Sequence, residues 1–323
     1  MDLQIGQTVK QLRVRQGVRQ ETLAQALGVS TQAVSKWENQ KAQPDISLLP
    51  LLAGFFQVSL ETLFFGFQEE DDALPEPVHR RLSENQRGWD GIVAADWGGT
   101  HLPVWGVYIP TEEELGLMAG EPCRRVLEIA CGDGRSLLYQ SQHGCQELWG
   151  LDMSPRQIAK ARARLADHGV AAQLFVSPME VNPGIPPAYF DCVYSVYGLG
   201  WTQDLEKTIA LAAGYLKPGG AFIFSWDNPI LRCIQARDGQ YVLAHPYADE
   251  PRFENRMRGE RVALINWKLS SYINTLIRHG LRIERLVEET RPPEGQAPFT
   301  EKYDSPHKAH YLHHTFVIKA RKA

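Results

Sequence analysis

The chain has 323 residues, of which 43% are hydrophobic and 22% charged, so its composition is that of ordinary globular protein and its length predicts two domains. No apolar run approaches the ~20 residues that cross a bilayer, and the first residues lack the apolar centre of a signal peptide, so we expect a cytoplasmic protein. The net charge of -4 gives no overall attraction to nucleic acid. The five cysteines form no C-x-x-C pair, which argues against a disulfide framework and a thiolate metal site.

Residues 1–67 predict an all-α domain of five short helices. Apolar residues at helical spacing begin with Ile5, and a second helix is expected from Gln20 to a turn at Gly28. Ser30 is the expected N-cap of the third helix. One face of that helix is polar, whereas Ala33, Val34 and Trp37 point inward; the polar face consists of Thr31, Gln32, Ser35, Lys36 and Asn39.

These polar groups suit base edges and phosphates, although a helix face of this kind can also be plain solvated surface. The stretch 19–66 closely resembles the helix-turn-helix domain of phage-repressor-type and xenobiotic-response-element-type regulators. The resemblance implies binding to double-stranded DNA, a role in transcription regulation and a homodimer on palindromic sites. It also implies phosphate contacts from Gln20, Ser30 and Asn39 and base contacts from Thr31, Gln32, Ser35 and Lys36.

An acidic, proline-bearing stretch begins at Gln68, and we predict a linker over residues 68–84. The following segment, residues 85–120, is rich in Trp and Tyr between glycines. Aromatic faces suit a cation or a flat ligand. The resemblance of the next domain to a known family, given below, implies that this segment forms a lid over the site of that domain. The alternative is that the aromatic residues simply pack beneath a loop; the lid candidates are Trp89, Trp97, His101, Trp105 and Tyr108.

The run VLEIACGDG, residues 126–134, is the strongest motif in the chain. It predicts a buried strand followed by a glycine turn that lets a nucleotide approach the backbone, and Asp152 then stands where a ribose is held. A dinucleotide fingerprint requires a third glycine where this chain has Leu137. From residue 124 onward strands alternate with helices expected at 135–142, 155–168, 204–215 and 267–279, which predicts a doubly wound α/β domain.

The spacing Glu128-x-Ala130-x-Gly132-x-Gly134 resembles the first motif of the Rossmann-like, class I S-adenosylmethionine-dependent methyltransferases, and LKPGGAFIFSW (residues 216–226) resembles a later one. The resemblance covers residues 85–323 and implies a seven-stranded mixed sheet with an antiparallel terminal strand, from expected strands 281–289 and 312–320. It implies S-adenosylmethionine as cofactor and S-adenosylhomocysteine as product. The implied cofactor-binding residues are Glu128, Ala130, Gly132, Gly134, Asp152, Met153, Pro178, Met179, Ser195 and Tyr197.

Each of these residues takes its role from the resemblance. Glu128 is expected to orient the amino-acid end of the cofactor, Asp152 to bind the ribose hydroxyls and Met153 to lie against adenine. Ser195 offers its carbonyl to the ammonium group, and Tyr197 neighbours the methyl group. The run Ser177-Pro178-Met179-Glu180 departs from the family, which often has an acid-small pair here, so adenine's exocyclic amine loses its usual carboxylate.

The sequence leaves the methyl acceptor open between a small molecule and a protein. DNA methylation is disfavoured, because residues 194–200 lack both the Asp-Pro-Pro-Tyr type of motif and a Pro-Cys nucleophile. The catalytic residue is unknown. His101 and Tyr197 are the first candidates for deprotonating the acceptor, with Asp227, His245 and Tyr303 behind them. The alternative to an enzyme is a transcription regulator whose methyltransferase-like domain senses the cofactor without significant turnover.

Overall fold

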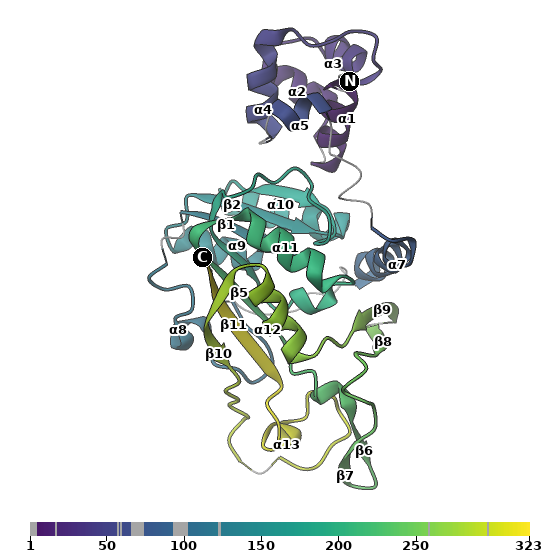
Figure 1. The fold of residues 1–323 in the computed structure, drawn as a ribbon, viewed down its shortest axis with the longest axis vertical. Coiled ribbons are helices and arrows are strands. Elements are labelled where there is room, and N and C mark those ends of the chain that lie inside the picture. The colour runs from purple at the N-terminus through teal and green to yellow at the C-terminus, as the bar shows by residue number, and fades with distance from the viewer. Residues whose placement is uncertain are drawn as a thin grey trace.

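A computed structural model describes residues 5–16, 18–56, 58, 60–65, 74–92, 103–121, 124–257, 259–295 and 297–323. A small helical unit at the N-terminus is followed by a larger unit in which helices flank a central sheet (Figure 1). Within the described ranges no helix is both long and apolar enough to cross a membrane.

The N-terminal unit packs short helices around a fully buried apolar centre. Val9, Leu12, Leu23, Val34 and Phe56 are at or near zero exposure. Gly28 ends the second helix in the left-handed conformation (φ 67°), as the sequence predicts. The elements are α1 (Ile5–Arg15), α2 (Gln20–Leu27), α3 (Thr31–Glu38), the 3-10 turn η1 (Ile46–Leu48), α4 (Leu49–Phe56) and α5 (Leu60–Phe65).

The second unit contains a seven-stranded sheet in the order β10-β11-β5-β4-β1-β2-β3. Strand β11 lies antiparallel to both of its neighbours, which confirms the predicted mixed sheet with an inserted antiparallel strand. The side chains of β5 alternate between two apolar layers: Phe222 and Phe224 enter one core cluster, and Ala221 and Ile223 enter the other. The strands are β1 (Arg125–Ile129), β2 (Glu147–Asp152), β3 (Gln173–Val176), β4 (Phe190–Ser195), β5 (Leu216–Asp227), β10 (Leu281–Val287) and β11 (Thr315–Lys322).

The helices of this unit follow the predicted alternation closely. They are α9 (Arg135–Gln142), α10 (Pro155–Asp167), α11 (Leu205–Tyr215) and α12 (Leu269–Arg278), with 3-10 turns η2 (Leu199–Trp201) and η3 (Leu231–Cys233). Strand β11 begins three residues later than predicted, because the short helix α13 (Pro306–Ala309) and a turn precede it.

Helix α7 (Glu76–Ile92) starts inside the stretch predicted as linker and packs against a hairpin that the sequence did not predict. The Asn85 side chain, 1% exposed, donates to the Ala263 carbonyl at 2.7 Å and accepts its N–H at 2.8 Å. Gly88 permits this approach, since a Cβ there would lie 2.2 Å from the Arg261 carbonyl oxygen. The two hairpins of this region are β6 (Ile234–Arg237) with β7 (Gln240–Leu243), and β8 (Arg252–Met257) with β9 (Glu260–Ile265).

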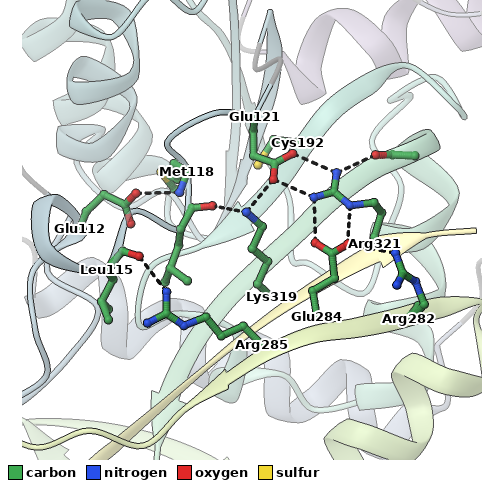
Figure 2. A network of polar contacts seen from close by, with 12 residues as sticks. Glu112, Leu115, Met118, Glu121, Cys192, Arg282, Glu284, Arg285, Lys319 and Arg321 are labelled. Carbon is green, nitrogen blue, oxygen red and sulfur yellow. Dashed lines mark hydrogen bonds and ion pairs between the residues drawn. The ribbon is translucent and has the colours of Figure 1, made fainter.

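Residues 103–121, which include α8 (Glu112–Leu115), are fastened to the β10–β11 side of the sheet by a polar network (Figure 2). Lys319 pairs with Glu121 at 2.6 Å and donates to the Leu117 carbonyl at 2.7 Å. Arg321 joins Glu121 to Glu284 on β10. This half of the predicted lid segment is therefore a fixed strap.

Candidate active site

A single cavity of about 1050 Å³ opens at the carboxyl ends of the central strands. The sheet reverses its strand order between β1 and β4, and ligands of doubly wound sheets bind at such a switch point. The volume stands at the upper end of the range of roughly 300–1,000 Å³ for ligand pockets. Seven of the ten predicted cofactor residues line it: Glu128, Ala130, Gly132, Asp152, Met153, Met179 and Tyr197.

The turn after β1 lines the cavity with Ala130, Cys131, Gly132 and Asp133. Ala130 and Gly132 have φ near 57° and 51°, and the Gly132 N–H donates to Asp152 at 3.0 Å. Gly134, expected to pass beside the cofactor, does not line the cavity. A Cβ at Gly134 would meet the Ala161 Cβ at 3.0 Å, so this glycine serves the close packing of α9 on α10.

Two buried carboxylates face the cavity from β1 and β2. Burial raises the pKa of Asp152 to about 6, although the N–H groups of Ser154 and Gly132 favour its ionised form. Burial also raises the pKa of Glu128 to about 8, against the opposing hydrogen bonds from Ser136 and Tyr194. Because Ser136 and Tyr194 offer only neutral hydroxyls, they do not balance the negative charge of ionised Glu128. A cation bound beside Glu128 can balance it. This arrangement fits the ammonium and ribose groups of an amino-acid nucleoside.

The other two predicted cofactor residues that do not line the cavity are Ser195 and Pro178. Ser195 is fully buried at the end of β4, and its hydroxyl has no hydrogen-bond partner among the described residues. Pro178 is half-buried beside Met179, which does line the cavity.

Beyond the cofactor motif, one polar cluster forms the opposite end of the cavity. The Asp227 carboxylate, 2% exposed, accepts hydrogen bonds from the phenols of Tyr197 and Tyr303 and from the Arg232 guanidinium. Burial and the Asp227 charge raise the pKa of both tyrosines well above the usual value, so both phenols are neutral donors at pH 7. Tyr197 is held in a left-handed conformation (φ 52°), and its N–H donates to the Ser225 hydroxyl at 2.9 Å.

The structure thus places three of the five candidate bases next to one another. Tyr197, Asp227 and Tyr303 share one hydrogen-bonded cluster, and all three line the cavity. His245 does not line it; its ring contacts the Gln235 amide at 2.8 Å. His101 lies outside the described residues, and within these no group of three His, Cys, Asp or Glu residues could hold a metal ion.

Three tryptophans that line the cavity pack against one another. Trp89 on α7 meets Trp201 edge to face with centroids 5.0 Å apart, and Trp201 meets Trp226 at 5.3 Å. Trp226 in turn packs on Tyr197 at 5.2 Å. Of the lid candidates, Trp89 lines the cavity.

Of the other lid candidates, Trp105 and Tyr108 are described by the structure, and neither lines the cavity. Trp105 is fully buried in the core and donates its indole N–H to Glu112 at 2.9 Å. Tyr108 donates its hydroxyl to the Asp304 carbonyl, and Trp97 lies outside the described residues. Smaller residues of the strap line the cavity instead, namely Pro103, Val104, Gly106 and Val107.

Sequence reasoning missed the residues that come from the insertion between β5 and α12. Arg232 and three residues of β8 line the cavity: Asn255, Arg256 and Met257. One signal was available. About 40 residues separate the predicted strand from the next helix, whereas a βα loop usually has 2–6, so this stretch had to contain structure of its own.

The predicted DNA-contacting face of α3 is present. Gln32, Lys36 and Asn39 are exposed and Thr31 and Ser35 are half-buried, whereas Val34 and Trp37 are buried. The Ser30 hydroxyl caps α3 by accepting the Ala33 N–H at 3.2 Å. Gln20, expected on phosphate, donates to Glu38 at 2.7 Å within the unit, and Glu38 also binds Arg13.

The fold and the pocket define a methyltransferase domain of the S-adenosylmethionine-dependent kind, joined to a helix-turn-helix DNA-binding domain. Comparison with known families agrees with both assignments. Residues 126–220 match the profile described as "Methyltransferase domain", and residues 9–63 match that described as "Helix-turn-helix". S-adenosylmethionine is the cofactor of this kind of methyltransferase domain, and the paired carboxylates of the pocket suit it.

Individual relatives match one domain at a time. Residues of the second unit are 34% identical over 113 positions to the malonyl-[acyl-carrier protein] O-methyltransferase of Enterobacter lignolyticus, covering 34% of this chain and 42% of that protein. The HTH-type transcriptional activator BcrR of Enterococcus faecalis is 36% identical over 78 residues, covering 24% and 37%. The chain thus spans about two fifths of the length of these relatives.

Among solved structures, the fold is similar to that of a putative S-adenosylmethionine dependent methyltransferase from Listeria monocytogenes. The TM-score is 0.52 at 22% identity, and the match covers 66% of this chain and 97% of that one. This similarity concerns the fold.

Proposed function

We propose that the protein is an enzyme that transfers a methyl group from S-adenosylmethionine to a small, flat, largely apolar acceptor carrying an O–H or N–H group. The observation that carries the proposal is the continuity of the cavity. The carboxylates Glu128 and Asp152, the three tryptophans and the Tyr197–Asp227 cluster all line one cavity. A domain that only sensed the cofactor would have no need for this second end.

The chain's own residues bind, orient and exclude water. Glu128 and Asp152 hold the two polar ends of the cofactor, which supplies an activated methyl group when bound. The phenol protons of Tyr197 and Tyr303 are committed to Asp227, so the phenol oxygens remain as acceptors for the O–H or N–H of the substrate. Alignment and desolvation can supply much of the rate of such a displacement, because the leaving group is good.

A transfer assay tests this proposal. The full chain is incubated with methyl-labelled S-adenosylmethionine and a low-molecular-weight extract of the host cells, and label is sought in organic-soluble products. We expect label there, and we expect Tyr197→Phe to lower the rate about 10-fold, as for the loss of one hydrogen bond of about 1.4 kcal/mol, with a smaller effect on cofactor affinity because the aromatic ring remains. Tyr108→Phe, which alters a phenol outside the cavity, is the matched control.

Two outcomes would redirect the assignment. Label in the protein fraction alone identifies a protein acceptor. If the cofactor binds but label reaches neither fraction, the proposal that the protein is an enzyme is contradicted. That result favours a transcription regulator that senses the cofactor.

We further propose that the N-terminal domain binds a specific palindromic DNA site as part of a homodimer and so regulates transcription. The exposed polar residues of α3 support this proposal.

A further inference from the structure

Hairpin β8–β9 brings positive charge to the cavity. Arg256 is exposed on β8 and lines the cavity, and it lies directly opposite Arg261, which is exposed on β9. Like charges directly opposite each other in a sheet are destabilising. Glu254 on the same strand pairs with Arg252 at 3.8 Å. Within the described ranges, neither Arg256 nor Arg261 forms an ion pair or a side-chain hydrogen bond.

The acids of the cavity do not balance the charge of Arg256. Asp133 and Asp227 pair with other arginines, and Asp304 lies within electrostatic reach of Lys308. The proposed function assigns the carboxylates of β1 and β2 to the cofactor. An anionic group on the acceptor is therefore the natural partner for the Arg256 guanidinium.

The hairpin holds Arg256 at a fixed place. The Asn85 side chain joins β9 to α7 through two hydrogen bonds with Ala263, and Gly88 lets the two elements approach closely. Only one guanidinium of the opposed pair lines the cavity, and its planar N–H groups match the two oxygens of a carboxylate. Arg261 adds to the positive potential that attracts such a group.

We propose that the acceptor carries a carboxylate in addition to its O–H or N–H group, and that Arg256 binds this carboxylate and so selects the acceptor. This inference rests on the proposed function. The carboxylate is a recognition group, so it takes no part in the transfer and remains free in the product. The sulfonium charge of the methyl donor also favours an anionic acceptor in the same cavity.

The first test measures the charge of the product and leaves the protein intact. The full chain is incubated with methyl-labelled S-adenosylmethionine and the low-molecular-weight extract, and the product is partitioned between ethyl acetate and water at pH 2 and at pH 9. We expect label in ethyl acetate at pH 2 and in water at pH 9, because a carboxylic acid is neutral only below its pKa of about 4. Label in ethyl acetate at both pH values shows a neutral product, and label in water at both indicates a phosphate or a similar group; either result overturns the proposal.

The second test removes the charge with Arg256→Gln. We expect the extract concentration that gives half-maximal labelling to rise about 5- to 10-fold, as for the loss of an ion pair at an exposed position, with the maximal rate little changed. Arg256→Lys keeps the charge and should restore most of the loss. A rise below 2-fold in Arg256→Gln, or a fall in the maximal rate alone, contradicts carboxylate binding by Arg256.

Arg252→Gln is the matched control, because Arg252 is exposed on the same strand and does not line the cavity. It should leave both values unchanged, and an equal effect of the two glutamine variants would contradict a specific contact at Arg256. Calorimetry with S-adenosylhomocysteine should give the wild-type affinity for every variant, which verifies that the pocket is folded. If the wild-type chain labels only neutral products, the Arg256 inference alone fails. If it labels no product, the proposed function fails as well.

Discussion

Glu128 and Asp152 lie on neighbouring strands and face the same cavity, yet their surroundings differ. Asp152 accepts two backbone N–H groups, which favour its charge and hold its pKa near 6 despite burial. Glu128 meets only hydroxyl donors, and its pKa rises to about 8. At pH 7 the free protein therefore has a mostly ionised Asp152 beside a mostly protonated Glu128. We propose that Asp152 binds the ribose of the cofactor and Glu128 its ammonium group.

This difference predicts a pH dependence of cofactor binding. An ammonium group favours the ionised form of Glu128, so binding lowers the pKa of Glu128 and releases a proton. Affinity for S-adenosylhomocysteine should rise between pH 6 and pH 8, by up to about 10-fold per unit, and level off above pH 8. Calorimetry in buffers of different ionisation heat measures the released proton.

Glu128→Gln removes the titrating group and should flatten this profile. Affinity that stays constant from pH 6 to pH 8 in the wild-type chain would contradict the assigned role.

The residues also show where sequence reasoning reaches its limit. The places of Asp152 and Gly132 at the cavity could be predicted from motif spacing, because both follow the ends of neighbouring strands within a short, local pattern. The roles of Gly134 and Trp105 depend on neighbours that are distant in sequence, Ala161 for Gly134 and the apolar core for Trp105. A single sequence does not show these neighbours. It therefore does not distinguish a residue that packs in the protein interior from one that contacts a ligand.

At the scale of elements, helices with strong apolar periodicity could be predicted from the sequence. The hairpins inserted between β5 and α12 could not. Helix α9 occupies the predicted residues 135–142, because its apolar spacing is regular and a glycine precedes it. Hairpin β8–β9 was missed, although it lines the cavity. The residues of β8 are alternately exposed and half-buried, so the sequence contains no apolar run that would indicate the strand.

Asn85 joins α7 to this hairpin, so we expect Asn85→Ala to destabilise the second unit by about 2 kcal/mol. The change leaves the buried N–H and carbonyl of Ala263 without partners. Urea unfolding followed by near-UV circular dichroism measures the loss. Ser83→Ala, an exposed position on the same helix, should stay within about 0.5 kcal/mol; equal stability of both variants would show that the bridge contributes nothing.

At the scale of the whole molecule, a helix-turn-helix domain and a methyltransferase domain share one chain. The net charge of -4 gives no general attraction to DNA. We therefore expect a DNA complex to depend on local contacts, and we propose that they come from the α3 surface, where Gln32 and Lys36 are exposed.

Gln32→Ala should weaken binding to the selected DNA site by about 5- to 150-fold and relax the preference at one base pair, because a bidentate amide contact discriminates by about 1–3 kcal/mol. Selection from random oligonucleotides followed by anisotropy titration measures both effects. Gln7→Ala changes an exposed glutamine on α1 and serves as the control. An unchanged base preference in Gln32→Ala would exclude Gln32 from base reading.

The most direct test of the central claim is calorimetric titration of the full chain with S-adenosylhomocysteine, alongside Asp152→Ala. We predict saturable binding at one site per chain, weakened on the order of 10- to 100-fold in the variant through loss of charge-assisted hydrogen bonds to the ribose. No saturable binding to the wild-type chain, or equal affinity in the variant, would contradict the account.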